Sequence, residues 1–268
     1  MDPDYFDRQK RIANWDQTIY SSMKVACLGV GGLGSIVSLN LCRLGIKHLI
    51  LIDYDTVEAH NLNRQLLFSK SDIGASKSQA AKRNLDSFHN LCTTIEAFNL
   101  DIIKYWSQVV SLIKDCSVVF NMIDYGDSFD LVAQSLCIKL NIPFIQGGTF
   151  SQMVNVEFFP PQGKSCLACG VDSDERLLEL IRPSKVLDIE NLEFLPKNVN
   201  PVGLSNCYLC GTCGMMMVAK LGEYLLASQG IEITNRTMFY MNTMESVNFM
   251  VDPKPGCVFC RDKSPESS

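Results

Sequence analysis

Membrane-spanning, strongly basic and repetitive segments are all missing from this 268-residue sequence. No apolar run reaches the ~18 residues that a membrane span requires, so no transmembrane helix is expected. No block of lysine or arginine stands out and the net charge is −5, which argues against a partner held through a phosphate backbone. The sequence contains no internal repeat and no low-complexity tract. Its 47% hydrophobic and 20% charged residues are typical of a globular protein with a sizeable core.

An export signal is also missing. The first eleven residues are polar and mixed in charge, unlike a signal peptide or an obvious transit peptide. We therefore expect a cytoplasmic protein and leave entry into the nucleus open. A chain of this length is expected to form one large domain, or one domain with a small annex.

Cysteine, by contrast, is abundant, with twelve in the chain. Without an export signal, a disulfide framework is not favoured. Five of the cysteines are single and lie in apolar segments, where we expect buried thiols that pack as small hydrophobic groups. These are Cys27, Cys42, Cys92, Cys116 and Cys137. The other seven are grouped and need a chemical explanation: Cys166/Cys169, Cys207/Cys210/Cys213 and Cys257/Cys260.

Short apolar runs alternate with helical patterns over residues 23–150. The runs predict buried strands and the amphipathic segments predict helices, the first of which ends at Gly45. The expected strands are 24–30, 48–55, 93–100, 116–124 and 143–150, and the expected helices are 34–45, 76–88 and 128–141. Such alternation predicts an α/β fold, a Rossmann-like, doubly wound and mainly parallel sheet.

The pattern changes after residue 150. We expect a helical arm over 1–22, one main domain over 23–260 and a disordered tail over 261–268. Within the main domain we expect an antiparallel strand at 153–160, an irregular crossover loop at about 170–206, a helix at 214–228 and paired late strands within 237–253. A long loop of this kind is usually functional or mobile.

A glycine-rich turn follows the first expected strand. Gly29 permits the tight turn, Gly31 lets the backbone approach a phosphate, and Gly34 allows close packing of helix on strand. The N–H groups at the start of the helix favour an anion. Asp53 ends the next strand, where a carboxylate can accept hydrogen bonds from ribose hydroxyls, although a turn or helix cap is an alternative.

Three polar side chains follow the ribose carboxylate and favour a triphosphate over a nicotinamide cofactor. A simple nicotinamide site has no need of Asn61, Arg64 and Lys77 at this point, so a dehydrogenase leaves them unexplained. Attack at an α-phosphorus needs cations that neutralise the departing pyrophosphate and the transition state. Charge patterning alone would assign Arg64 and Lys77 to an ordinary solvated surface.

The motifs together resemble the ThiF/MoeB and ubiquitin-activating enzyme superfamily from about Tyr5 to Cys260. The residues that carry the resemblance are Gly29, Gly31, Gly32, Gly34, Ser35, Asp53, Asp55, Val57, Asn61, Leu62, Arg64, Gln65, Gly74 and Lys77. In that family, ATP adenylates the C-terminal carboxylate of a small ubiquitin-fold protein. The resemblance implies that the glycines, Asp53 and Asp55 belong to the ATP site, with Asp53 on the ribose. It also implies that Asn61, Arg64 and Lys77 surround the phosphates.

Two further positions take roles from the resemblance. Asp124 ends a strand at the point where relatives bind Mg²⁺ through a carboxylate, and its alternative role is that of a turn residue. Relatives often continue with asparagine, whereas this chain has Tyr125, which weakens any role for that second position. Arg8 matches an arginine that reaches the neighbouring subunit's ATP site in dimeric relatives, so a homodimer is implied. Its alternative is a plain surface arginine.

Two Cys-x-x-Cys pairs, Cys166/Cys169 and Cys257/Cys260, predict a structural Zn²⁺ site of the zinc-knuckle type. Many family members carry the same two halves. The alternatives are two disulfides or redox pairs. The site would hold the C-terminal segment on the main domain.

The cysteine trio is harder to assign. Thioester-forming relatives place a nucleophilic cysteine about 9–14 residues before the helix glycine, which from Gly214 falls on 200–205, where there is no cysteine. Cys207 is the nearest candidate nucleophile and Cys210 the next, while Cys213 is expected to face the helix interior. The alternatives are packing thiols, metal ligands, or no covalent step.

The expected function is ATP- and Mg²⁺-dependent adenylation of the C-terminus of a ubiquitin-like modifier or sulfur carrier. We expect a minimal adenylation core without a separate catalytic-cysteine domain, rhodanese segment or ubiquitin-fold tail. The acyl group would then pass to a thiol here or on a downstream conjugating or sulfur-transfer enzyme. The alternatives are adenylation of a tRNA or peptide substrate, of which the acidic composition disfavours tRNA, and a non-catalytic heterodimer partner.

Overall fold

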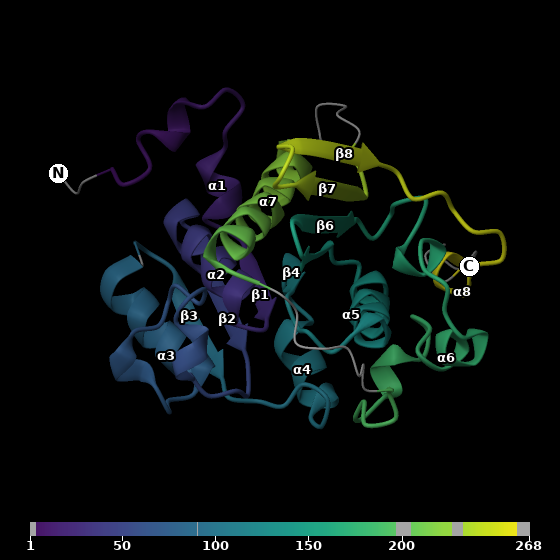
Figure 1. Cartoon of the computed structure of the whole chain (residues 1–268). Helices are drawn as coiled ribbons and strands as arrows, with labels where there is room; N and C mark the ends of the chain where they lie inside the picture. The colour runs from purple at the N-terminus through teal and green to yellow at the C-terminus, as the bar shows by residue number, and fades with distance from the viewer. Residues whose placement is uncertain (1–3, 90, 197–204, 227–232, 262–268) are drawn as a thin grey trace.

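The structure, a computed structural model, describes residues 4–89, 91–196, 205–226 and 233–261 (Figure 1). Most of the tail expected at 261–268, and the last part of the expected crossover loop, lie outside these residues. The described chain builds one eight-stranded sheet with the strand order β3-β2-β1-β4-β5-β6-β7-β8.

The first five strands are parallel, as the alternation of strands and helices predicts. They are β1 (Lys24–Leu28), β2 (His48–Ile52), β3 (Thr94–Phe98), β4 (Val118–Asn121) and β5 (Phe144–Phe150). The central strand β1 pairs with β2 on one side and with β4 on the other, so the chain order reverses there. In open sheets of this kind, ligands bind beyond the carboxyl ends of the strands at that reversal.

The last three strands are antiparallel and extend the sheet at one edge. They are β6 (Met153–Phe159), β7 (Arg236–Tyr240) and β8 (Glu245–Phe249). The expected antiparallel strand and the late strand pair are therefore confirmed. Alternate residues of β6 point to opposite faces: Val154, Val156 and Phe158 are buried in the core that includes α7.

Eight α-helices lie in the described residues: α1 (Gln17–Tyr20), α2 (Gly32–Leu44), α3 (Lys77–Asn84), α4 (Trp106–Ile113), α5 (Asp127–Leu140), α6 (Glu175–Leu180), α7 (Cys207–Leu226) and α8 (Val258–Arg261). Short 3₁₀ turns occupy Gln9–Arg11, Ala59–Asn61, Lys70–Asp72, Leu167–Cys169 and Val186–Asp188, and a π turn occupies Leu85–His89. As expected, α2 ends at Gly45, which has a φ of 78°.

Helices cover both faces of the sheet, and β1 shows how (Figure 1). Val25 and Cys27 point into the core that α2, α3 and α7 cover, while Ala26 and Leu28 point into the core that α4 and α5 cover. The two apolar layers give the doubly wound arrangement that the sequence predicts.

Three stretches differ from the sequence-based expectation. Helix α4 was not predicted, although Trp106, Val109 and Ile113 form its buried stripe. The crossover segment is not irregular throughout, since it contains α6 and the turn Val186–Asp188. In the described part of the arm, helical structure is limited to Gln9–Arg11 and α1.

Candidate nucleotide and metal sites

The glycine loop joins β1 to α2 at the point where the strand order reverses. Gly29 has a φ of +90°, which a residue with a side chain rarely adopts, and its N–H donates to the Ile52 carbonyl at 2.9 Å. A Cβ at Gly34 would overlap the Gly29 carbonyl oxygen. The first turn of α2 can lie this close to the strand only because position 34 is glycine. The start of α2 therefore faces the ligand edge of the sheet.

Asp53 lies beside this loop at the carboxyl end of β2. Its Oδ2 accepts the Val30 N–H at 2.7 Å and its Oδ1 accepts the Asp55 N–H at 2.9 Å. Only 6% of Asp53 is exposed, and this burial raises the pKa of its carboxyl, which the charge of Lys77 opposes. The carboxylate thus holds the backbone of the glycine loop in place.

Lys77 brings a buried cation to the same edge. It is the first residue of α3, and its Nζ lies 2.8 Å from Oδ2 of Asp55, which is half exposed. The Lys77 N–H also donates to the Asp55 carbonyl at 2.9 Å. The structure therefore joins Asp53, Asp55 and Lys77 into one charged group.

Asn61 and Arg64 come from the segment between these two elements. The Asn61 side-chain oxygen accepts the Glu58 N–H at 3.0 Å, so this buried side chain closes the turn Ala59–Asn61. Arg64 donates to the His60 carbonyl and to Asn63 at 3.0 Å each, and its Cγ lies beside Gly32. Arg64 thus reaches the glycine loop, while the Asn61 side chain stabilises the turn that precedes it.

Two polar atoms at the loop lack partners within the described part of the chain. They are Oε1 of Gln65 and Oγ of Ser35, both buried. The Nε2 of Gln65 lies nearest to the space that a Cβ at Gly31 would fill. Buried polar atoms are normally hydrogen-bonded. The Ser35 hydroxyl can donate to a phosphate oxygen and the Gln65 amide oxygen can accept from a ribose hydroxyl, so both atoms fit a nucleotide. Both residues stand in the sequence motif, but neither was singled out there as a ligand.

The carboxyl end of β4 completes this edge. A Cβ at Gly29 would meet Met122 and Ile123, which directly follow β4. Asp124 comes next and is exposed, so its carboxylate oxygens are available to a hard cation such as Mg²⁺. Its charge also acts on Asp130 of α5, whose pKa is raised to about 8, chiefly by burial.

A pocket of about 410 Å³ opens beside β4 and β5, on the face of the antiparallel strands away from α7. Its polar wall is a hydrogen-bonded row: Asn121 donates to Asp130 at 2.7 Å, Gln146 donates to Glu157, and Glu157 pairs with Arg236. The apolar part of the lining includes Phe150, Met153, Met238 and Phe249. This pocket was not predicted from the sequence, because its lining comes from segments far apart in the chain.

Helix α7 begins at Cys207 rather than at Gly214, which corrects the placement of the cysteine trio before the helix. Cys207 is exposed, whereas Cys210 is buried, with its sulfur 2.9 Å from Oγ of Ser205 and beside Gly32. Burial raises the pKa of Cys210, and Arg64 opposes this. Cys213 faces the core, as expected, and burial raises its pKa as well. Exposure therefore favours Cys207 over Cys210 as a nucleophile.

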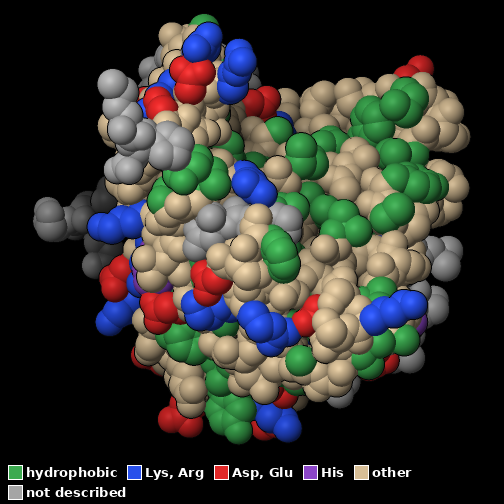
Figure 2. All heavy atoms as spheres, turned by 90° about the vertical axis from the view of Figure 1, so that its left-hand side faces the viewer, with side chains coloured by type: hydrophobic (Ala, Val, Ile, Leu, Met, Phe, Trp, Pro, Cys, Tyr) green, Lys and Arg blue, Asp and Glu red, His purple; other side chains and the backbone are tan. Residues whose placement is uncertain are grey.

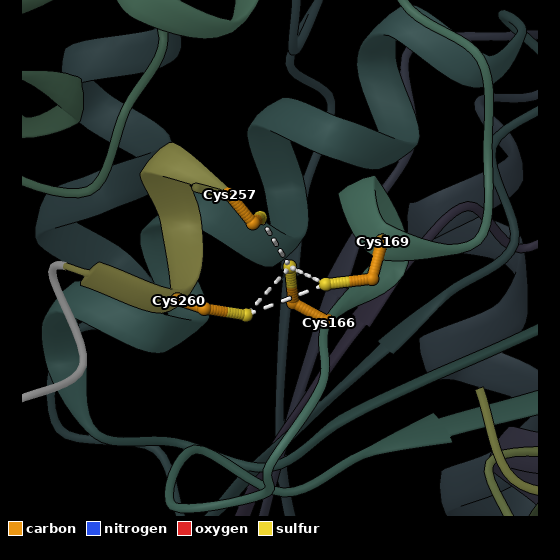
Figure 3. A group of neighbouring side chains, drawn as sticks. All are labelled: Cys166, Cys169, Cys257 and Cys260. Atoms are coloured by element: carbon orange, nitrogen blue, oxygen red, sulfur yellow. Dashed lines mark hydrogen bonds between the residues drawn. The ribbon is translucent and has the colours of Figure 1, made fainter. Parts of the chain in front are cut away.

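The second site is a cluster of four thiols (Figure 3). Cys166 lies 3.6 Å from Cys169, 3.5 Å from Cys257 and 3.5 Å from Cys260, and Cys169 lies 3.4 Å from Cys260, sulfur to sulfur. Tetrahedral Zn²⁺ with bonds of about 2.3 Å requires sulfurs about 3.8 Å apart, so the cluster fits this ion. Hydrogen bonding, first from Cys166, lowers the pKa of Cys257 to about 6.

Arg8 lies far from the glycine loop of its own chain. It is exposed in the N-terminal arm, where Phe6 contacts Gly45 and Gln9 donates to the Leu44 carbonyl at 3.2 Å. The arm is therefore anchored at the C-terminal end of α2, and the loop is at the N-terminal end. The 13 residues of α2 separate the two by ~18 Å, more than an arginine side chain spans.

Fold and sites together define a nucleotide-binding α/β protein with a cluster of four cysteines. The chain belongs to the ThiF family, whose profile matches residues 6–258. No helix among the described residues combines the length and the apolar character that a bilayer crossing requires.

Among known proteins, the chain is similar to ubiquitin-like modifier-activating enzyme 5 of Drosophila grimshawi. The two are 33% identical over 156 residues, which cover 54% of this chain and 39% of the relative. It is also similar to the NEDD8-activating enzyme E1 catalytic subunit of Dictyostelium discoideum, at 26% identity over 64% of this chain and 40% of the relative. The match thus spans about two fifths of these curated relatives' length.

Solved structures show the same fold. MccB of E. coli, crystallised with ATP, superposes with a TM-score of 0.69 at 22% identity, covering 91% of this chain and 68% of MccB. PaaA superposes with a TM-score of 0.66 at 20% identity, covering 88% of this chain and 66% of PaaA.

Proposed function

We propose that this protein uses ATP and Mg²⁺ to adenylate the C-terminal carboxylate of a ubiquitin-like modifier or a sulfur-carrier protein. The observation that carries the proposal is the grouping of Asp53, Arg64 and Lys77 around the glycine loop. A simple nicotinamide site does not need two cations at this place, whereas a triphosphate does. Membership of the ThiF family and relatives named as modifier-activating enzymes support the same reading.

In this reaction, a carboxylate oxygen of the modifier attacks the α-phosphorus of ATP and pyrophosphate leaves. No protein nucleophile is needed for this step, because positioning and charge stabilisation suffice. The loop N–H groups and the start of α2 would hold phosphate, and Arg64 and Lys77 would stabilise the charge of the departing pyrophosphate. Mg²⁺ held by Asp124 would supply further positive charge to the phosphate oxygens.

The pocket beside β4 and β5 offers a place for the modifier's C-terminal segment. It lies at the carboxyl ends of the strands that flank the nucleotide edge, and its apolar residues continue onto the open face of β6, β7 and β8. Val247 and Phe249 on this side are exposed large hydrophobic residues, which is common in surfaces that bind proteins. A protein substrate therefore fits better than a free small molecule.

A homodimer is the second part of the proposal. Arg8 cannot reach its own loop, so a role in phosphate binding would require a second copy of the chain. Figure 2 shows hydrophobic side chains gathered at the upper right of one face, where charged side chains are sparse. Exposed apolar residues such as Tyr208 and Met215 on α7 and Ile19 on α1 are of the kind found in protein interfaces.

The acyl-adenylate then passes to a thiol. On this chain we assign that role to Cys207 ahead of Cys210, because Cys207 is exposed at the start of a 20-residue helix. The other acceptor class is a thiol of a downstream conjugating or sulfur-transfer enzyme.

The test is ATP–pyrophosphate exchange with the purified protein and each small ubiquitin-fold protein of the same organism that ends in glycine. One of them should support exchange well above the background without substrate. Exchange with a peptide or a tRNA instead would point to adenylation of that substrate class. Failure of every carboxylate substrate, with ATP binding intact, would leave the non-catalytic partner as the better account.

A further inference from the structure

The first turn of α7 carries two thiols of opposite character. Cys207 is the first residue of the helix and is exposed, while Cys210, one turn later, is buried. Ideal helix geometry places the Cα atoms of residues i and i+3 about 5 Å apart. Disulfide bonds join Cα atoms about 4.4–6.8 Å apart, so this pair can be bridged with little movement of the backbone.

The surroundings suit thiol–disulfide exchange. The N–H groups at the start of a helix stabilise a thiolate, and α7 is 20 residues long. An exposed thiolate there can attack a small disulfide in solution. The second sulfur, on Cys210, is buried, and this residue lies one helical turn from Cys207. The exposed thiol of Cys207 can therefore attack the external disulfide, and the buried thiol of Cys210 can then attack the mixed disulfide on Cys207.

We propose that Cys207 and Cys210 form a redox-active pair that closes reversibly to an intramolecular disulfide. The oxidant is a low-molecular-weight disulfide such as oxidised glutathione. The Cys207 thiolate attacks one of its sulfurs, which forms a mixed disulfide and releases one glutathione thiolate. The Cys210 thiol loses its proton and attacks the Cys207 sulfur, which releases the second glutathione. One disulfide is thus reduced, one is formed, and both thiol protons end on glutathione.

Closure of the pair would reach the nucleotide loop. In the reduced form, the Cys210 sulfur lies between the Ser205 hydroxyl and Gly32, which is the first residue of α2. Under this proposal, a bond to Cys207 would move this sulfur from its place beside Gly32. The oxidised chain therefore lacks the contact that fills the space beside Gly32, and its Cys207 can no longer accept an acyl group. The pairing itself does not depend on the proposed adenylation.

The remaining cysteines do not offer the same arrangement. Cys213 follows Cys210 by three residues, but its sulfur faces the carbonyls of Gly148 and Asn155 inside the core. Cys92 is exposed but has no cysteine at the same helical spacing. The four thiols of the cluster in Figure 3 hold one another and are the expected zinc ligands. Cys92 and Cys213 therefore serve as controls.

The test treats the full-length, zinc-loaded protein with oxidised glutathione, blocks the remaining thiols with N-ethylmaleimide and maps peptides by mass spectrometry. Wild type should show a Cys207–Cys210 disulfide in most molecules and no glutathione on Cys207. Cys210→Ser should instead retain glutathione on Cys207, because no second thiol displaces it. Cys92→Ser and Cys213→Ser should form the Cys207–Cys210 disulfide to the same extent as wild type.

Two outcomes would overturn the proposal. One is a wild-type chain in which Cys207 and Cys210 stay free under conditions that modify the exposed Cys92. The other is a persistent glutathione adduct on Cys207 of wild type, which would mean that Cys210 does not displace it. Neither outcome bears on adenylation, which pyrophosphate exchange by the reduced protein measures separately. A dithiol reductant should restore both thiols fully.

Discussion

At the scale of single residues, the polar side chains of the nucleotide edge hold the backbone as well as face the ligand. Asp53 accepts the Val30 and Asp55 N–H groups, and Asn61 accepts the Glu58 N–H. The sequence left open whether Asp53 is a cap or a ribose ligand. Its backbone contacts support the role of a cap. They do not exclude a ribose ligand, because each carboxylate oxygen has more than one lone pair. Side chains fixed in this way can orient a ligand without reorganisation.

Asp124 is the first residue to test. We expect Asp124→Ala to lower pyrophosphate exchange at least about 100-fold, because a metal ion contributes several kcal/mol to charge stabilisation in such reactions. Asp115→Ala is the matched control, since this exposed aspartate precedes β4 at the opposite edge of the sheet. The fold should be intact in both variants by circular dichroism. Near-normal exchange by Asp124→Ala would remove this carboxylate from the site.

Asp130 gives a prediction about pH. Its pKa of about 8 lies far above the usual value of a carboxyl, first because of burial and further because of Glu157, Asp127 and Asp124. The folded chain therefore keeps a proton that the unfolded chain releases above pH ~4, so its stabilising contribution is present at low pH and is lost as pH rises towards 8. Asn mimics the protonated carboxyl at every pH.

We expect the free energy of unfolding of Asp130→Asn to exceed that of wild type by an amount that grows by about 2 kcal/mol from pH 5 to pH 8, after a discount for partial exposure. Urea unfolding at pH 5, 6, 7 and 8 measures this difference. Asp115→Asn, at an exposed position outside α5, is the control and should show no such trend. A difference that stays constant with pH would contradict the buried, protonated carboxyl.

At the scale of elements, α2 meets β1 and α7 through two glycines that differ in what surrounds them. A Cβ at Gly34 would overlap backbone, the Gly29 carbonyl oxygen, whereas a Cβ at Gly32 would overlap only the Cys210 sulfur. Backbone cannot move aside as a side chain can. We expect Gly34→Ala to cost about 3 kcal/mol of stability and Gly32→Ala about 1 kcal/mol.

The double variant separates these causes. Cys210→Ala should remove most of the cost of Gly32→Ala, because the added methyl group then occupies the space that the sulfur leaves. The same change should not help Gly34→Ala. Chemical denaturation of the single variants and the two double variants measures how far Cys210→Ala restores the stability of each glycine variant. If it restored Gly32→Ala and Gly34→Ala equally, the contact between Cys210 and Gly32 would not be the cause.

The regular elements follow from local patterns, whereas the exceptions depend on tertiary packing. Buried apolar runs predicted all five parallel strands, and Gly45 ended α2 as expected. The start of α7 was missed because Gly211 and Thr212 are poor helix formers, and packing on α2 overrides their propensity. The pocket beside β4 and β5 could not be predicted, because sequence spacing does not reveal which strand residues share a face across five strands.

At the scale of the whole molecule, the four-cysteine cluster ties the C-terminal segment to the segment after β6. Cys166 and Cys169 lie at the two ends of the turn Leu167–Cys169, and Cys257 and Cys260 lie just before and within α8. We expect about one Zn²⁺ per chain by elemental analysis, and Cys166→Ser should lose it and lower the Tm by at least about 5 °C. Cys92→Ser should keep the bound zinc and the wild-type Tm. Freshly purified protein without zinc would rule out the zinc assignment.

The proposed dimer depends on the position of Arg8. The arm that carries Arg8 is anchored at the C-terminal end of α2, and the glycine loop lies ~18 Å away at the other end of this helix, so we expect Arg8 to serve the loop of a second copy. Arginine suits this role because its planar fork contacts two phosphate oxygens at once. A site would then combine Asp53 of one chain with Arg8 of the other, and variants of the two residues can test this together.

Chains with Arg8→Ala or Asp53→Ala should each be inactive in pyrophosphate exchange. When the two are mixed, each heterodimer contains one site with both groups intact. If subunits exchange at random and sites act independently, half the dimers are mixed and half of their sites are complete, so about a quarter of wild-type activity should return. Arg11→Ala, a change of another exposed arginine of the same arm, is the control and should be active alone. Proven heterodimers without recovery, or a fully active monomer, would show that Arg8 does not act across subunits.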